Sequence, residues 1–182
     1  ADSPLLPSPQ AFETDLIEMF EAEWRLQRGD QPLGRIAIVD DHPQTQYLYP
    51  EFLLAQKMFR RSGIDAVIAG PQELELSNGA LMLEGNPIDL VYNRLVDFAF
   101  EQPEHAIIGQ AYEAGIAVVT PNPHNHALLA DKRNLTIFSD TEMLEDMGVP
   151  SALRDVVKAI PKTVLVTPAT AEVLWRERKH LF

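Results

Sequence analysis

Charged and amide side chains follow three of the short apolar runs in this sequence, close to the point where each run ends. Asp40 and Asp41 close the first run, Arg94 follows the next, and Asn122 lies two residues beyond the last. An arginine binds a carboxylate or a phosphate through two parallel hydrogen bonds. If the runs are parallel strands, their carboxyl ends meet at one edge, where open α/β sheets bind ligands. The pattern therefore predicts a small-molecule cleft lined by these four side chains.

The apolar runs and the segments between them must supply the elements that hold this cleft. Short runs rich in β-branched residues predict buried strands at 35–40, 65–69, 88–92 and 116–120. Amphipathic segments that begin at proline or capping residues and end at glycine predict helices at 9–28, 50–62 and 104–114. A strand, a helix and a second strand in succession form a βαβ unit with a right-handed crossover. We therefore expect an α/β fold built on a parallel sheet.

The first predicted helix begins at Ser8, a capping residue followed by Pro9, and ends at Gly29. Apolar side chains recur along it at spacings of three and four, at Phe12, Leu16, Met19, Phe20 and Trp24. Such spacing predicts that these side chains form one apolar stripe that packs on the rest of the protein.

Two alternating apolar and polar segments, 73–76 and 81–84, flank Ser77-Asn78-Gly79. Alternation on both sides of Asn-Gly is a strong signal for a β-hairpin. We expect this hairpin at an edge of the sheet.

The sequence pattern changes beyond residue 120. Pro121-Asn122-Pro123 predicts a rigid turn, followed by short helices and one more strand. The predicted helices cover 124–130, 132–146, a short segment after Pro150, and 168–178, and the predicted strand covers 162–166. Residues 1–8 are predicted to be an irregular arm, and Leu181-Phe182 to begin another strand.

Composition excludes several classes of function. The 182 residues carry 15 Lys and Arg against 27 Asp and Glu, a formal charge of −12, which argues against nucleic acid as a partner. Zero cysteines exclude disulfides, thiolate metal sites and cysteine nucleophiles. No apolar run approaches the roughly 18 residues of a membrane span, so we expect no membrane partner and a cytoplasmic location.

Three short motifs follow the last cleft-forming strand in a particular order. Asp131-Lys132 opens a helix, Gly148-Val149-Pro150 breaks the chain, and Ile160-Pro161-Lys162-Thr163 leads into a predicted strand. This order resembles the junction between the pre-ATP-grasp and ATP-grasp domains of ATP-dependent carboxylate–amine ligases. Residues 36–40, the hairpin and residues 88–94 are similar to glutathionylspermidine-synthase-like and circularly permuted ATP-grasp proteins.

The resemblance implies three parts of the chain. An N-terminal arm and helix would cover 1–32, and a Rossmann-like pre-ATP-grasp domain with an edge hairpin would cover 33–130. The truncated beginning of an α+β ATP-grasp domain would cover 131–182. On this reading the sequence is the N-terminal fragment of a longer ligase and is inactive alone.

The resemblance also implies roles for particular residues. Lys132 would reach the phosphates of ATP, where an ammonium group is well suited to a polyphosphate. Asp40, Asp41, Arg94 and Asn122 would line the substrate site. The intact protein would use ATP and Mg²⁺ to join a small-molecule carboxylate to an amine. Catalytic residues and metal ligands are not expected within this stretch.

An alternative reading starts from Val39-Asp40-Asp41-His42-Pro43, which resembles the acidic pair on the first strand of response-regulator receiver domains. A receiver needs a phosphorylated aspartate at the end of its third strand, where this chain has Asn93 or Arg94. A receiver-like, non-catalytic signalling or binding module therefore remains the second hypothesis.

Overall fold

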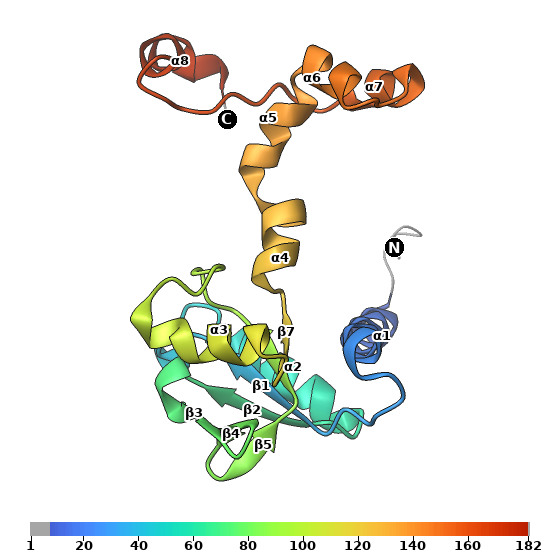
Figure 1. The fold of residues 1–182 in the computed structure, drawn as a ribbon, viewed down its shortest axis with the longest axis vertical. Helices are drawn as coiled ribbons and strands as arrows, with labels where there is room; N and C mark the ends of the chain where they lie inside the picture. Colours follow the sequence, from blue (N-terminus) through green and yellow to red (C-terminus); the bar gives the residue numbers. More distant parts are fainter. Residues whose placement is uncertain (1–7, 182) are drawn as a thin grey trace. The chain divides into compact units, whose positions relative to one another are not determined.

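The computed structural model describes residues 8–181 and divides the chain into two compact units, Ala1–Pro123 and His124–Phe182 (Figure 1). The predicted irregular arm, except Ser8, lies outside the described residues, as does Phe182 of the predicted terminal strand. The first unit holds both sheets and most of the buried hydrophobic side chains of the described chain.

A four-stranded parallel sheet forms the centre of the first unit. Its strands are β1 (Arg35–Val39), β2 (Asp65–Ala69), β6 (Leu90–Asn93) and β7 (Val118–Thr120), in the order β2-β1-β6-β7. Val39 pairs with Ala69 on one side and with Asn93 on the other, so the carboxyl ends of β1, β2 and β6 lie level. The predicted α/β class with a parallel sheet is confirmed.

Helices cover both faces of this sheet. On one face α1 (Pro9–Arg28) and α2 (Tyr49–Arg61) pack on Ile36, Ile38 and other strand side chains. On the other face lies α3 (Ala106–Glu113), with Ile108 and Ala111 against Val91. The alternation of strand side chains between faces produces these two apolar clusters.

Helix α1 begins and ends as expected: Ala11 N donates to Ser8 Oγ (3.1 Å), and Gly29 adopts a positive φ of 61° at its end. Its buried side chains are Ile17, Phe20 and Trp24. The stripe predicted from the sequence was partly wrong, because Phe12 and Met19 are 55% and 47% exposed. At about 100° per residue they lie roughly 140–160° around the helix from Ile17.

A second, antiparallel sheet contains β3 (Leu74–Ser77), β4 (Ala80–Leu83) and β5 (Asn86–Ile88). The predicted hairpin is confirmed, with Ser77 paired to Ala80 across Asn78 and Gly79, both at positive φ. Its expected place at an edge of the parallel sheet was wrong, because β3 and β4 pair with β5 in a sheet of their own. This sheet packs on the α3 face of the parallel sheet through Leu74, Leu81 and Leu83.

The strand predicted at 88–92 is divided between the two sheets, which corrects the sequence prediction. Ile88 ends β5, and Leu90 begins β6. Between them, the carboxylate of Asp89 accepts hydrogen bonds from Gly34 N (2.9 Å) and Arg35 N (2.8 Å). A side chain bonded to the start of β1 fixes this crossing point between the sheets.

The second unit consists of short helical segments. They are α4 (Pro123–Asn125), a π-helical turn (His126–Ala130), a 3₁₀ turn (Lys132–Asn134), α5 (Leu135–Phe138), α6 (Thr141–Asp146), α7 (Ser151–Val157), α8 (Ala171–Glu177) and a 3₁₀ turn (Arg178–His180). The helix predicted at 132–146 is broken because Asp140 caps a new helix, its Oδ1 accepting from Met143 N at 3.0 Å.

The strand predicted at 162–166 is not formed, since residues 161–167 have no strand partner among the described residues. Side-chain oxygens bind backbone amides here instead: Thr163 N donates to Ser139 Oγ, and Thr167 N donates to Thr170 Oγ1, both at 2.8 Å. A β-prone sequence makes a strand only when a neighbour supplies its ladder of hydrogen bonds. Within residues 8–181, no helix is both long and apolar enough to cross a membrane.

Candidate functional site

The ends of β1 and β6 bring three of the predicted site residues to one edge of the parallel sheet. Asp40 N donates to Ala69 O (3.3 Å), which continues the β1–β2 ladder by one bond. Arg94 N donates to Val39 O (2.9 Å), which does the same between β6 and β1. Asp40, Asp41 and Arg94 therefore leave the sheet from neighbouring strands at its carboxyl edge, where open α/β sheets bind ligands.

Arg94 occupies the α2 side of this edge and is already held by protein groups. Its Nη2 lies 3.1 Å from Oε1 of Glu51, and its Nη1 donates to the Tyr92 hydroxyl at 3.1 Å. The guanidinium carbon lies 5.4 Å from the centre of the Tyr92 ring and 5.7 Å from that of Phe52. Aromatic faces attract a guanidinium and fix its plane. Glu51, which is half exposed, is the partner that an incoming carboxylate would replace.

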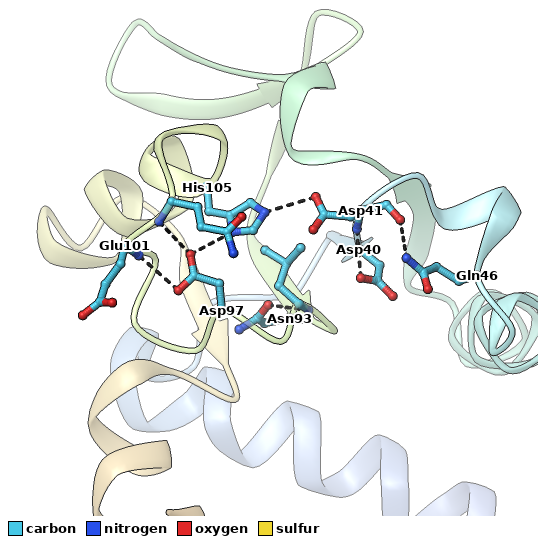
Figure 2. A network of polar contacts seen from close by, with 9 residues as sticks. Asp40, Asp41, Gln46, Asn93, Asp97, Glu101 and His105 are labelled. Atoms are coloured by element: carbon cyan, nitrogen blue, oxygen red, sulfur yellow. Dashed lines mark hydrogen bonds and ion pairs between the residues drawn. The ribbon is translucent and has the colours of Figure 1, made fainter.

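A second polar group lies on the α3 side, where the ring of His105 bridges two aspartates (Figure 2). Nδ1 of His105 is 2.8 Å from Oδ2 of Asp97, and Nε2 is 3.1 Å from Oδ1 of Asp41. The His105 side chain is 1% exposed and that of Asp97 8%, whereas that of Asp41 is 44% exposed. The cluster thus consists of a buried pair, His105 and Asp97, and the carboxylate of Asp41, which faces solvent.

The pKa values of the buried pair move in opposite directions. Burial disfavours the charged form of His105, but hydrogen bonds to Asp97 and Asp41 outweigh it and raise the pKa of the imidazole. Burial likewise opposes the ionised form of Asp97. The backbone amides of Gln102 (2.9 Å) and Glu101 (3.1 Å), together with His105, lower the pKa of that carboxyl below its ordinary value. Both shifts favour an ion pair.

The carboxyl of Asp40 lies close enough to Arg94 and His105 to be affected by the charge of each. Burial, reinforced by the charge of Asp41, raises its pKa, while the amide of Asp41 and the cations Arg94 and His105 partly offset that rise. Its Oδ1 accepts from Asp41 N at 2.8 Å. This carboxyl therefore stays ionised less readily than a solvent-exposed aspartate and responds to any ligand charge placed beside it.

Two asparagines extend the polar edge towards β7. Asn93 is buried, with Oδ1 accepting from Leu95 N (3.1 Å) and Nδ2 donating to Pro121 O (3.3 Å). Asn122, the fourth predicted cleft residue, is also buried, one residue beyond that carbonyl. The amide of Asn93 thereby fixes the turn in which Asn122 lies.

Lys132 lies in the second unit, at the first position of a 3₁₀ turn. Asp131 caps this turn by accepting from Arg133 N (2.8 Å), and its contacts with the Arg133 side chain and amide lower its pKa to about 2. Lys132 itself is exposed, and its ammonium group has no hydrogen bond or ion pair with any described residue. Its charge is thus available to a solvent-borne anion.

Asp97 lies a few residues after the apolar run 88–92, but nothing in the local sequence singles out His105 or Glu51. His105 contacts Asp41 across 64 positions of sequence. Its local surroundings, Pro103-Glu104-His105, indicate only the start of a helix. Glu51 reads as an ordinary acid in the first turn of a helix. Neither residue carries a local sequence signal for its partner.

In the described part of the chain, no group of three or more His, Cys, Asp or Glu side chains is arranged to hold a metal ion. No family model and no curated protein matches the sequence. The fold and the site thus define an α/β protein with a charged cluster at the carboxyl edge of its parallel sheet.

Proposed function

We propose that this chain provides the substrate-binding part of an ATP-dependent carboxylate–amine ligase of the ATP-grasp type. In this proposal residues 33–130 are its Rossmann-like pre-ATP-grasp domain, and residues 131–182 begin the ATP-grasp domain. The observation that supports it is the meeting of Asp40, Asp41 and Arg94 at the carboxyl edge of β1 and β6. These are the positions at which the resemblance implies a substrate site.

The side chains at this edge suit the two substrates of such a reaction. Arg94, held in plane by Tyr92 and Phe52, offers its guanidinium to a carboxylate in place of Glu51. Acids outnumber cations around it, and the solvent-facing carboxylate of Asp41 favours the ammonium form of an amine. The carboxylate would take the terminal phosphoryl group of ATP and release ADP. The bound ammonium would then lose a proton to solvent, and the neutral amine would displace phosphate to form the amide.

Lys132 is the residue that we assign to the nucleotide. Its exposed ammonium group lacks a protein counter-ion among the described residues, so a phosphate would meet no competing partner. ATP would supply the phosphoryl group and, with Mg²⁺, the charge balance of the transfer. This chain's own contribution would be a point charge that holds the phosphates.

The experiment is an assay of phosphate release from ATP by the full-length protein in the presence of Mg²⁺. Panels of carboxylates and amines, drawn from amino acids, short peptides and diamines, are added singly and in pairs. We expect phosphate release that requires one carboxylate and one amine together. Arg94→Ala should abolish it, whereas Arg25→Ala, which removes an exposed arginine of α1, should not.

Phosphate release that needs neither substrate, or that Arg94→Ala leaves intact, would contradict the proposal. Incorporation of a phosphoryl group into the protein itself, read by intact mass after incubation with acetyl phosphate and Mg²⁺, would favour the receiver-like reading instead.

A further inference from the structure

Both ring nitrogens of His105 face carboxylate oxygens, Nδ1 towards Asp97 and Nε2 towards Asp41 (Figure 2). A neutral imidazole has one N–H and one lone pair, so it donates to only one of two carboxylates. The imidazolium form has two N–H groups and donates to both. The geometry is therefore that of a protonated histidine enclosed between two ionised aspartates.

The charged groups around this ring come from several elements. Asp41 follows β1, together with Asp40, whose carboxyl also feels the charge of His105. Asp97, Glu101 and Glu104 lie on the same loop and turn as His105, and Arg94 opens that loop. The 3₁₀ turn Pro71–Glu73 packs beside the turn Pro103–His105, and its Glu73 carboxylate is engaged by the amide of Gly70. Of these groups, Asp97 and Asp41 hydrogen-bond the ring, and these two carboxylates stabilise its cationic form.

The two loops that meet at His105 each hold a strained residue. His42, directly after Asp41, has a φ of 44°, and Phe100, between Asp97 and His105, has a φ of 56°. Residues other than glycine adopt positive φ only where surrounding contacts hold them there. Phe100 is buried against Gly109 of α3, where an added Cβ would lie 3.2 Å from the Cβ of Phe100. The contacts of His105 supply a second anchor to the same loop.

We propose that His105 is a positioning residue whose imidazolium forms a proton-dependent clasp. The clasp joins the segment after β1 (residues 40–48) to the segment after β6 (residues 94–105), and it orients the solvent-facing carboxylate of Asp41 at the carboxyl edge. It stands independently of the ligase assignment, because it depends only on contacts within the first unit.

When the imidazolium loses one of its two ring protons, the contact with Asp41 breaks and the contact with Asp97 is kept. Asp97 is held in place by two backbone amides as well as by His105, whereas the Asp41 carboxylate has the ring as its partner outside its own segment. The neutral ring retains its N–H towards the buried Asp97, and its lone pair then faces Asp41. Repulsion between that lone pair and the carboxylate releases Asp41 and frees residues 40–48.

The test is ¹⁵N NMR of the histidine ring in the whole chain, assigned through the backbone, across a pH series. We expect both ring nitrogens of His105 to keep imidazolium shifts to a higher pH than in an unstructured histidine peptide. Amide hydrogen exchange in residues 40–48 should rise at least about tenfold over the same pH interval, beyond the intrinsic base catalysis seen in β1.

Asp41→Asn tests the clasp without removing a buried group, since Asp41 is partly exposed. This variant should lower the pKa of His105 and remove the pH dependence of exchange in residues 40–48. Glu104→Gln, which removes an exposed acid of the same turn, should change neither. A pKa of His105 at or below that of the unstructured histidine peptide would overturn the proposal. A His105 titration that Asp41→Asn leaves unchanged would also overturn it.

Discussion

The carboxylate of Glu51 on helix α2 lies 3.1 Å from the guanidinium of Arg94, at the end of β6. The arginine that we assign to a substrate carboxylate therefore already has a carboxylate partner within the protein. Any acidic ligand that binds there competes with Glu51 for the same edge of the guanidinium. A substitution at Glu51 should therefore change the affinity of the site for an acidic ligand.

Glu51→Gln should strengthen the binding of a simple dicarboxylate such as succinate. Removing the competing charge frees the guanidinium, and a partly exposed ion pair of this kind is worth about 0.2–1 kcal/mol, or roughly a factor of 1.4 to 5 in affinity. Isothermal titration calorimetry on the full-length protein measures the change. Glu18→Gln, an exposed acid of α1, is the matched control and should leave the affinity unaltered. Weaker binding in Glu51→Gln would mean that Glu51 contacts the ligand directly.

Lys132→Ala should weaken ATP binding to the full-length protein by about tenfold or more, as expected for loss of a charge-assisted contact to phosphate. Lys57→Ala removes an exposed lysine of helix α2 and should have no effect. Calorimetric titration with ATP and Mg²⁺ compares the three proteins. Equal affinities in all of them would remove Lys132 from the nucleotide site.

The His105–Asp97 pair predicts how the stability of the first unit depends on pH. Because folding raises the pKa of His105, its contribution is complete below the unfolded value of about 6.5 and is lost as the pH rises through the folded value. Because folding lowers the pKa of Asp97, its contribution is present above about 3.9 and is lost as the pH falls through the folded value. Both contributions are therefore complete between about pH 3.9 and pH 6.5, and the pair stabilises the fold most in that interval.

Urea denaturation at a series of pH values checks this dependence. The fluorescence of Trp24, which is buried in the first unit, reports its unfolding once the exposed Trp175 is replaced by phenylalanine. Asp97→Asn should flatten the pH dependence as well as lower the stability. If Asp97→Asn has the same pH profile as its parent, the pair does not contribute as we describe.

Phe20→Ala should destabilise the first unit by about 3–5 kcal/mol, because it leaves a cavity at a fully packed site. Its ring makes edge-to-face contacts with Phe59 and Tyr92, at centroid distances of 5.0 and 4.9 Å. Phe12→Ala, on the exposed side of the same helix, should change the free energy of unfolding by less than about 1 kcal/mol. Similar losses in both variants would place the packed face of α1 elsewhere.

Much of the sheet could be predicted from the sequence, because hydrophobic pattern and turn chemistry are local signals. Residues 35–39 and 65–69 are short and rich in β-branched or small apolar side chains, and Asn78-Gly79 fixes the hairpin. The crossing at Asp89 could not be predicted in this way. It depends on a carboxylate that bonds the amide of Arg35, the first residue of β1, and that of Gly34 just before it, more than fifty positions earlier.

The candidate site was only partly predictable for the same reason. The rule that strand ends gather at one edge identified Asp40, Asp41 and Arg94, since it needs nothing more than strand order. His105 belongs to the site because its ring contacts aspartates from two different loops. Glu51 belongs to it because α2 directs its carboxylate towards Arg94. The unpaired segment 161–167 shows the converse, a strong local pattern without the neighbour that a strand requires.

Isotope transfer tests the ligase proposal most directly. The full-length protein is incubated with ATP, Mg²⁺, an amine and a carboxylate labelled with ¹⁸O in both oxygens, and the released phosphate is examined by mass spectrometry. A ligase that passes through an acyl phosphate delivers one ¹⁸O from the substrate to phosphate with each turnover. Phosphate that carries no ¹⁸O while ATP is consumed would contradict the account.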